Sequence, residues 1–318
     1  MLVLAGAMVC FAAFFAAGRS RTAPVAVTAQ VPVGAAVGAP AAVVGSAPGT
    51  AVARRAQPDA DALPPGRRVA NVGMSLTWLG WALLVAGLVV RGIWAGRAPW
   101  GNMYEFSLSS AAVALTVFLG ISTRRDVRWL GLFVVVPVLL TIGLAVTVLY
   151  TEAAQLVPAL KSYWLVIHVL AAIISGAAFL VTGAVSMLYL VRERAERRAG
   201  PDGVPTGPIS SHLPTAERLD AMAYRIIAFT FPLWTFAVIA GAIWAENAWG
   251  RYWGWDPKET WAFVTWVVFA AYLHARATAG WRGRRAAYIA LAGFATFVIN
   301  YFAVNIFASG LHSYGGLS

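Results

Sequence analysis

The sequence predicts an all-α, polytopic membrane protein with about eight transmembrane helices and a tryptophan-rich loop on its outer face. Of its 318 residues, 60% are hydrophobic and only 12% are charged, and the mean hydropathy is +0.70. A soluble domain carries about twice that share of charged residues. Apolar runs near the length of about 20 residues that crosses a bilayer recur along the chain. These observations argue against a water-soluble enzyme.

The first apolar run covers residues 1–18. Arg19 and Arg21 follow this run instead of preceding it, which is the reverse of the charge order in a cleaved signal peptide. We therefore expect a first transmembrane span with its N-terminus outside. Residues 19–69 are low in complexity and rich in Ala, Val, Pro and Gly, so we expect a cytoplasmic linker that carries no chemistry.

Seven further apolar runs are expected to cross the membrane: 70–90, 105–122, 129–149, 163–191, 226–244, 258–275 and 286–308. Basic residues concentrate in three of the intervening loops, which the positive-inside rule assigns to the cytoplasm. They are Arg124, Arg125 and Arg128; Arg192, Arg194, Arg197 and Arg198; and Arg276, Arg282, Arg284 and Arg285. The alternate loops and the C-terminus then face outward, with Arg91, Arg97, Arg251 and Lys258 as basic exceptions.

This topology explains the net charge of +11 without a nucleic-acid partner, and membrane lipid is the expected surrounding. Cys10 is the one cysteine of the chain and lies in the first apolar run. An internal disulfide, a CxxC redox pair and a thiolate metal cluster are thereby excluded. Any metal chemistry falls to the four histidines.

The outer loop at 244–261 reads WAENAWGRYWGWDPKETW and crowds several tryptophans, among them Trp249, Trp253 and Trp255. Tryptophan is common at membrane interfaces, but an interfacial belt needs far fewer of them. Glycines in the same loop allow a close approach of the backbone to a ligand. The density therefore indicates that a flat aromatic group packs here.

Asp256 has a local structural role available to it as well. It is suited to the N-cap of a helix, with Pro257 at the first helical position and Glu259 as the partner in a capping box. These three residues are therefore expected to be structural, whatever the tryptophans bind.

Counting about 20 residues outward from a basic inner boundary places each histidine in depth. His168 and His312 both emerge at the outer face, level with the tryptophan loop, whereas His274 lies at the inner end of its span. His212 lies in a polar inner loop and is expected to be solvated. Two imidazoles at one depth beside an aromatic platform look like axial ligands of an iron porphyrin.

These motifs resemble a known family. WGRYWGWDPKETW at 249–261 resembles the WWD signature of haem-handling membrane proteins, and VNIFASGLHSYG at 304–315 resembles the C-terminal signature of the CcsA/ResC branch of system II cytochrome c synthesis. GNMYEF at 101–106 is similar to an outer-loop element of the same proteins. The resemblance covers roughly residues 70–318.

The resemblance implies that His168 and His312 flank the WWD loop and ligate haem iron at the outer face. It implies that His274 is a transient ligand where haem enters, with a partner histidine from a ResB-type subunit. Trp249, Trp253, Trp255 and Asp256 would belong to the haem-binding loop. With that subunit, the chain would form a haem ligase that attaches haem b to the CxxCH motif of apocytochrome c in the cell membrane.

No acid, base or nucleophile of this chain is required for that reaction, so no catalytic residue is assigned and its status as an enzyme stays open. Three alternatives remain. A system I haem-delivery protein shares the WWD signature. A permanent b-type haem electron carrier needs paired histidines, ideally at both membrane faces, and only the outer pair is complete. A solute transporter usually has polar groups near the bilayer midplane, which we do not see here.

Overall fold

The computed structural model describes residues 1–17, 66–153, 161–200 and 203–312, and within these ranges it contains helices and no strand. The helices are α1 Leu2–Ala17, α2 Arg67–Ala95, α3 Met103–Ser122, α4 Gly131–Thr147, α5 Tyr163–Ala199, α6 Ala216–Trp249, α7 Pro257–Thr278, α8 Arg284–Val298 and α9 Val304–Phe307. Short 3₁₀ turns precede α4 and α6, and a π-helical segment, Ile299–Ala303, joins α8 to α9.

Six helices of the described chain are long and apolar enough to cross a membrane: Arg67–Ala95, Met103–Ser122, Arg128–Thr147, Tyr163–Ala199, Ala216–Trp249 and Arg284–Phe307. The predicted all-α, polytopic membrane fold is thus confirmed. The other two predicted spans are less apolar or shorter. Helix α1 has 16 residues, and α7 carries charged residues at both ends. Crossing by residues 1–18 and 258–275 stays a prediction.

The predicted linker at 19–69 lies outside the described residues as far as residue 65. Its predicted end is slightly late, because α2 already begins at Arg67. The tryptophan loop is also shorter than the predicted range of 244–261. Helix α6 continues to Trp249 and ends where Gly250 adopts a left-handed conformation with φ 70°, and α7 begins at Pro257.

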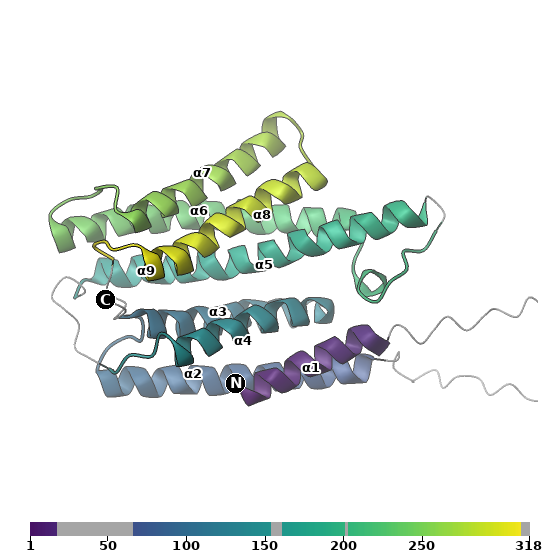
Figure 1. Cartoon of the computed structure of the whole chain (residues 1–318), viewed down its shortest axis with the longest axis horizontal. Coiled ribbons are helices and arrows are strands. Elements are labelled where there is room, and N and C mark those ends of the chain that lie inside the picture. Colours follow the sequence, from purple (N-terminus) through teal and green to yellow (C-terminus); the bar gives the residue numbers. More distant parts are fainter. Residues whose placement is uncertain (18–65, 154–160, 201–202, 313–318) are drawn as a thin grey trace, which may run out of the picture.

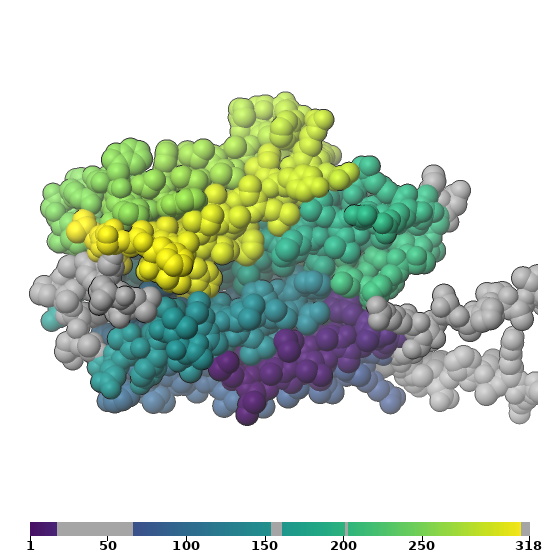
Figure 2. Space-filling model, in the orientation of Figure 1, coloured from purple at the N-terminus to yellow at the C-terminus, as the bar shows by residue number. Residues whose placement is uncertain are grey.

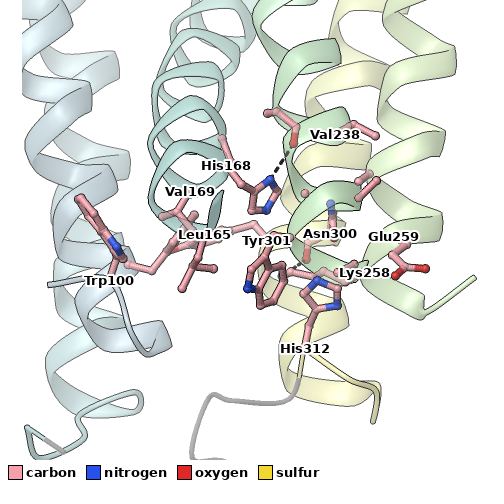
Figure 3. A pocket seen from close by; sticks show the side chains of 18 of the residues that line it. Trp100, Leu165, His168, Val169, Val238, Lys258, Glu259, Asn300, Tyr301 and His312 are labelled. Atoms are coloured by element: carbon pink, nitrogen blue, oxygen red, sulfur yellow. Dashed lines mark hydrogen bonds between the residues drawn. The ribbon is translucent and has the colours of Figure 1, made fainter. Parts of the chain in front are cut away.

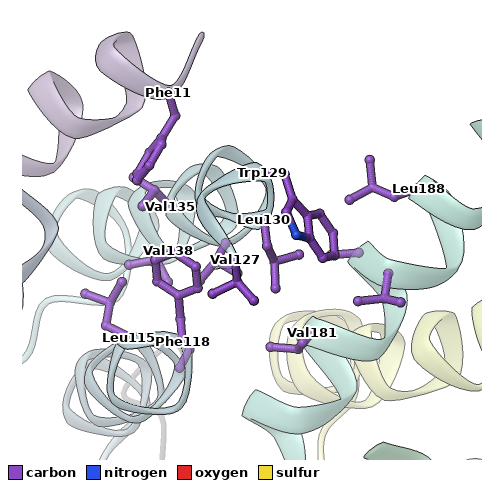
Figure 4. Packing of buried hydrophobic residues seen from close by; sticks show 14 of the residues in the cluster. Phe11, Leu115, Phe118, Val127, Trp129, Leu130, Val135, Val138, Val181 and Leu188 are labelled. Carbon is purple, nitrogen blue, oxygen red and sulfur yellow. The ribbon is translucent and has the colours of Figure 1, made fainter. Parts of the chain in front are cut away.

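The helices pack roughly side by side, and α5 and α6 form the most extensive pair (Figure 1). One buried cluster joins α1, α3, α4 and the C-terminal half of α5, where Phe11, Phe118 and Leu130 are fully buried (Figure 4). A second cluster joins α5 to α6, α7 and α8 around Phe179 and Phe269, whose rings stack at 4.2 Å. In the face shown in Figure 2, α8 lies between α7 and α5, and α1 lies against α4.

The loops gather at the two ends of the bundle in the alternation that the charges predict (Figure 1). At the end that holds the tryptophan loop, three of the four basic exceptions, Arg91, Arg97 and Arg251, pair with carboxylates of the same chain. Glu105, which is fully buried, accepts hydrogen bonds from Arg91 at 3.0 Å and Arg97 at 2.6 Å. Arg251 pairs with Glu259 at 3.3 Å. The assignment of the opposite end to the cytoplasm stays a prediction.

His212 lies in the turn before α6, as expected, but it is half-buried and therefore less solvated than the sequence suggests. Its ring packs edge-on against Phe14 and Phe15 of α1, with centroid distances of 4.7 and 5.6 Å. The contact arises because α1 ends beside the 3₁₀ turn that precedes α6. These two segments are far apart in the sequence, so no local pattern predicts that they meet.

Candidate functional site

A large cavity opens beside the tryptophan loop, between α5, α6, the start of α7, the π-helical segment and the turn that precedes α3 (Figure 3). The space between its walls, with its open mouth, amounts to about 1280 Å³. Both His168 and His312 line it. Most of the remaining wall is apolar or aromatic, including Trp100, Trp234, Trp244, Trp253 and Phe297. Such a cavity suits a large, flat, mostly apolar ligand.

His168 enters the cavity from the second turn of α5, which Ser162 caps. Its Nδ1 donates a hydrogen bond to the backbone carbonyl of Ala237 on α6, at 2.7 Å. A carbonyl only accepts, so the proton resides on Nδ1, and Nε2 keeps its lone pair. One helical turn further along α6, Gly241 makes room for the imidazole, because a Cβ there would lie 2.7 Å from the ring.

His312 approaches from the C-terminal segment that follows α9. Its Nδ1 donates to Oδ2 of Asp256 at 2.8 Å, while the amide of Leu311 donates to Oδ1 of the same carboxylate at 2.7 Å. A side chain at Gly310 would overlap this carboxylate, so glycine is required there. The carboxylate thus holds a proton of His312 on Nδ1, as the Ala237 carbonyl does for His168, and Nε2 is left for a ligand.

Asp256 performs the capping role that the sequence predicts and a second role besides. Its side chain accepts from the amide of Lys258, and Glu259 completes the capping box, so that prediction is confirmed. Burial acts to raise the pKa of Asp256, but hydrogen bonds from His312 and from the Leu311 amide outweigh it, and the pKa lies below its ordinary value. The carboxylate is therefore ionised at neutral pH and attracts the Nδ1 proton of His312.

Trp244 lies between the two histidines. Its ring is nearly parallel to that of His168, with an interplanar angle of 10° and a centroid distance of 6.2 Å. The same indole meets His312 at 5.7 Å. Trp244 is 2% exposed and belongs to a small buried cluster with Leu165 and Val169. It therefore sets the relative placement of the two imidazoles.

The three tryptophans predicted for the site occupy different positions. Trp249 packs edge-on against His312 at 4.9 Å, and Trp253 lines the cavity. Trp255 is 65% exposed, and within the described chain it is the one residue other than glycine with a positive φ, 59°. This conformation costs a bulky residue roughly 1–2 kcal/mol. The loop thus holds the Trp255 indole outward on the rim instead of in the cavity wall.

His274 lies far from this cavity. It is exposed on α7, one turn before the helix ends at Thr278, at the opposite end of the bundle from the tryptophan loop. The predicted site residues therefore divide into a group around His168 and His312 beside the tryptophan loop and one isolated histidine at the other end of the bundle. That this other end is the inner one stays a prediction.

Sequence reasoning missed several residues that shape the site. Nothing in a local pattern indicates that Gly241 faces His168, or that the carboxylate of Asp256 reaches His312. The one available signal was the spacing of Ala237, Gly241 and Trp244, which places small and aromatic residues on the same face of α6.

The arrangement presents two imidazoles, each held by a hydrogen bond at Nδ1, whose Nε2 atoms are left for a ligand. Histidines that bind metals almost always donate their other ring N–H to a carbonyl or a carboxylate in this way. Aromatic rings around them offer stacking surface for a macrocycle. The residues present therefore fit an iron porphyrin bound through two axial nitrogens.

Comparisons with known proteins show the family of the chain. Residues 100–312 match the family described as cytochrome C assembly protein. The chain is 37% identical over 265 residues to "Cytochrome c biogenesis protein CcsA" of Guillardia theta, a match that spans 79% of this chain and 88% of the relative. Proteins of the same name from Parasynechococcus marenigrum and Synechococcus elongatus are 39% and 37% identical, over 73% and 78% of this chain and 83% and 87% of theirs.

Proposed function

The chain belongs to the cytochrome c assembly protein family and acts in cytochrome c biogenesis as a multi-pass membrane protein; on that premise we propose that it binds haem b as a substrate. In this proposal His168 and His312 ligate the iron at the outer face of the cell membrane. The haem is then presented to apocytochrome c.

One observation carries the proposal. The Nδ1 atoms of His168 and His312 are both engaged, by the Ala237 carbonyl and the Asp256 carboxylate, while both rings line one cavity. Two unrelated backbone segments thus hold two imidazoles, each through Nδ1. Histidines that ligate a metal almost always donate their other ring N–H in this way, and two such histidines at one cavity support bis-histidine ligation of iron.

The groups that react during attachment belong to the two substrates, apocytochrome c and haem. Each thiol of an apocytochrome CxxCH motif adds across a vinyl group of haem: the S–H bond breaks, a C–S bond forms, and the proton adds to the vinyl carbon. No external oxidant or reductant is consumed. This chain contributes the position of the porphyrin and the ligation of its iron, so it acts as the haem-holding part of a ligase complex.

His274 has a separate place in the proposal. Its exposed position at the opposite end of α7 suits a transient iron ligand where haem enters from the cytoplasm. A single exposed histidine leaves one axial position open. A second ligand from a ResB-type membrane subunit would complete it, and that subunit would join the same ligase complex.

The test is the haem content of the purified full chain, co-expressed with its partner, in cells with and without apocytochrome c. A haem-handling protein should be partly loaded, and its loading should rise without the acceptor, whereas an electron carrier stays stoichiometric in both. His168→Ala and His312→Ala should lower the loading and the yield of mature cytochrome c. His212→Ala, at the other end of the bundle, is the matched control. Haem-free protein in all cells would refute the proposal.

A further inference from the structure

Lys258 occupies an unusual place in the cavity. It is the second residue of α7, it is half-buried, and among the described residues that line the cavity it is the one lysine or arginine. It also lines a small neighbouring pocket together with Asn305 and His312. A cation therefore lies at the wall that also carries one of the two proposed iron ligands.

The ammonium group of Lys258 has one neutral acceptor. Its Nζ donates to the backbone carbonyl of Asn300 at 2.9 Å, which leaves two of its three N–H donors. The structure shows no ion pair for it within the described chain. A half-buried cation without an anionic partner is costly, so the site is suited to an anion from outside the chain.

The two nearest carboxylates are committed elsewhere. Asp256 accepts from His312 and from the amides of Leu311 and Lys258. Glu259 accepts from the amide of Gly254 at 2.9 Å and from the Asp256 amide at 3.1 Å, and it pairs with Arg251. Neither carboxylate therefore occupies the remaining donors of Lys258.

Asn300 adds a second, independent sign of an incomplete polar site. It is 6% exposed, it lines the same cavity, and its Oδ1 has no hydrogen-bond partner within the described residues. It lies in the π-helical segment Ile299–Ala303. Single π-helical turns within α-helices are frequent at functional sites, and buried polar atoms are rarely left without a partner.

We propose that Lys258, positioned by the Asn300 carbonyl, binds a propionate carboxylate of the haem that His168 and His312 ligate. This inference rests on the proposed function and identifies the part of haem that the lysine recognises. Haem carries two propionates on one half of the porphyrin and two vinyl groups on the other half. An ion pair at Lys258 therefore turns the vinyl half away from the π-helical wall, toward the apocytochrome thiols.

The experiment compares haem with its dimethyl ester, which has the same iron and macrocycle but no free carboxylate. Both are titrated into the full chain, purified in detergent from cells that make no haem, and binding is followed by the Soret absorbance. Lys258→Met removes the charge at nearly constant length, and Lys258→Arg keeps it. Lys161→Met, an exposed lysine just before α5, is the matched control.

The wild type should bind haem about tenfold to a hundredfold more tightly than the ester, as expected for one charge-assisted hydrogen bond. Lys258→Met should abolish this preference by weakening haem alone, Lys258→Arg should retain most of it, and Lys161→Met should leave it unchanged.

Two results would overturn the inference while leaving the proposed function intact. They are equal binding of both porphyrins by the wild type, and an equal loss for both in Lys258→Met. Failure of the wild type to bind either porphyrin would instead refute the proposed function itself, and this inference with it.

Discussion

The carboxylate of Asp256 accepts a hydrogen bond from Nδ1 of His312 at 2.8 Å, although 56 residues separate the two in the sequence. The same carboxylate caps α7. The start of α7 and the C-terminal segment are thereby fixed to each other. Asp256 stands at the end of the tryptophan loop. A ligand of His312 is therefore positioned relative to this loop by the hydrogen bond between the two residues.

Asp256→Asn tests this connection. The two carboxylate oxygens together accept from His312 and from the amides of Leu311 and Lys258, and an amide side chain has one acceptor oxygen for all three donors. Loss of such a partner of a metal-binding histidine typically costs 10–100-fold in metal affinity. We expect a fall of about that size in haem affinity, measured by titration of the Soret band.

Glu259→Gln is the control for Asp256→Asn. It weakens the same capping box and the pair with Arg251, but it does not touch His312. The melting temperature should fall in both variants, and the haem affinity should fall in Asp256→Asn alone. An equal loss of affinity in both would mean that Asp256 acts only through the helix cap.

Gly241→Ala should displace His168. An added Cβ would lie 2.7 Å from two atoms of the imidazole, closer than packed atoms approach, so the ring must move away from the Ala237 carbonyl. We expect loss of one axial ligand, seen as conversion of low-spin to high-spin haem. Gly120→Ala adds the same methyl group where no atom lies within 4 Å, and its spectrum should match the wild type. A low-spin spectrum in both variants would contradict the role of Gly241.

Acid should destabilise the end of the molecule that holds the tryptophan loop through Asp256. Its pKa lies below the ordinary value in the folded protein, so the unfolded chain binds the proton more readily. The stability contributed by the carboxylate is complete above the unfolded pKa, about 3.9, and is lost as the pH falls toward the folded pKa. Melting temperatures in detergent from pH 6 to pH 3 should therefore fall less steeply in Asp256→Asn than in the wild type. Parallel curves would be inconsistent with this linkage.

Glu105→Gln should be among the most destabilising polar substitutions in the chain. Glu105 is fully buried and pairs with both Arg91 and Arg97, whose side chains are only 10% and 11% exposed. Breaking a buried pair leaves uncompensated charge and typically costs about 3–5 kcal/mol. Denaturant or thermal unfolding in detergent measures the loss.

Asp126→Asn provides the comparison for Glu105→Gln. Asp126 also pairs with an arginine, Arg128, at 2.7 Å, but its side chain is 55% exposed. An exposed pair contributes about 0–1 kcal/mol. Similar losses of stability in the two variants would show that the Glu105 cluster is not the buried junction described here.

The sequence predicted most of the helices, and the placement of His168 and His312 at one end of the bundle, for a simple physical reason. Crossing a bilayer requires a long apolar run, and a helix rises about 1.5 Å per residue. Counting from the basic loops therefore placed His168 and His312 at one level. The cap at Asp256 was equally local, since three neighbouring residues determine it.

Contacts between distant segments could not be predicted in this way. Residue counting gives the depth of a side chain but not the rotation of its helix, so the meeting of His168 with Gly241 and Trp244 was not foreseen. The pairing of Arg97 with Glu105 depends on how α2 and α3 join. The Asn300 carbonyl reaches Lys258 only because the last helices lie beside α7, which no local pattern reveals.

The most direct test of the account is the absorbance spectrum of the haem-loaded protein, oxidised and reduced, for the wild type and for His168→Ala combined with His312→Ala. Two axial imidazoles predict a low-spin spectrum in the wild type that becomes high-spin or disappears in the double variant. A wild-type spectrum that is high-spin, or a low-spin spectrum that survives both substitutions, would contradict the assignment of these histidines as the iron ligands.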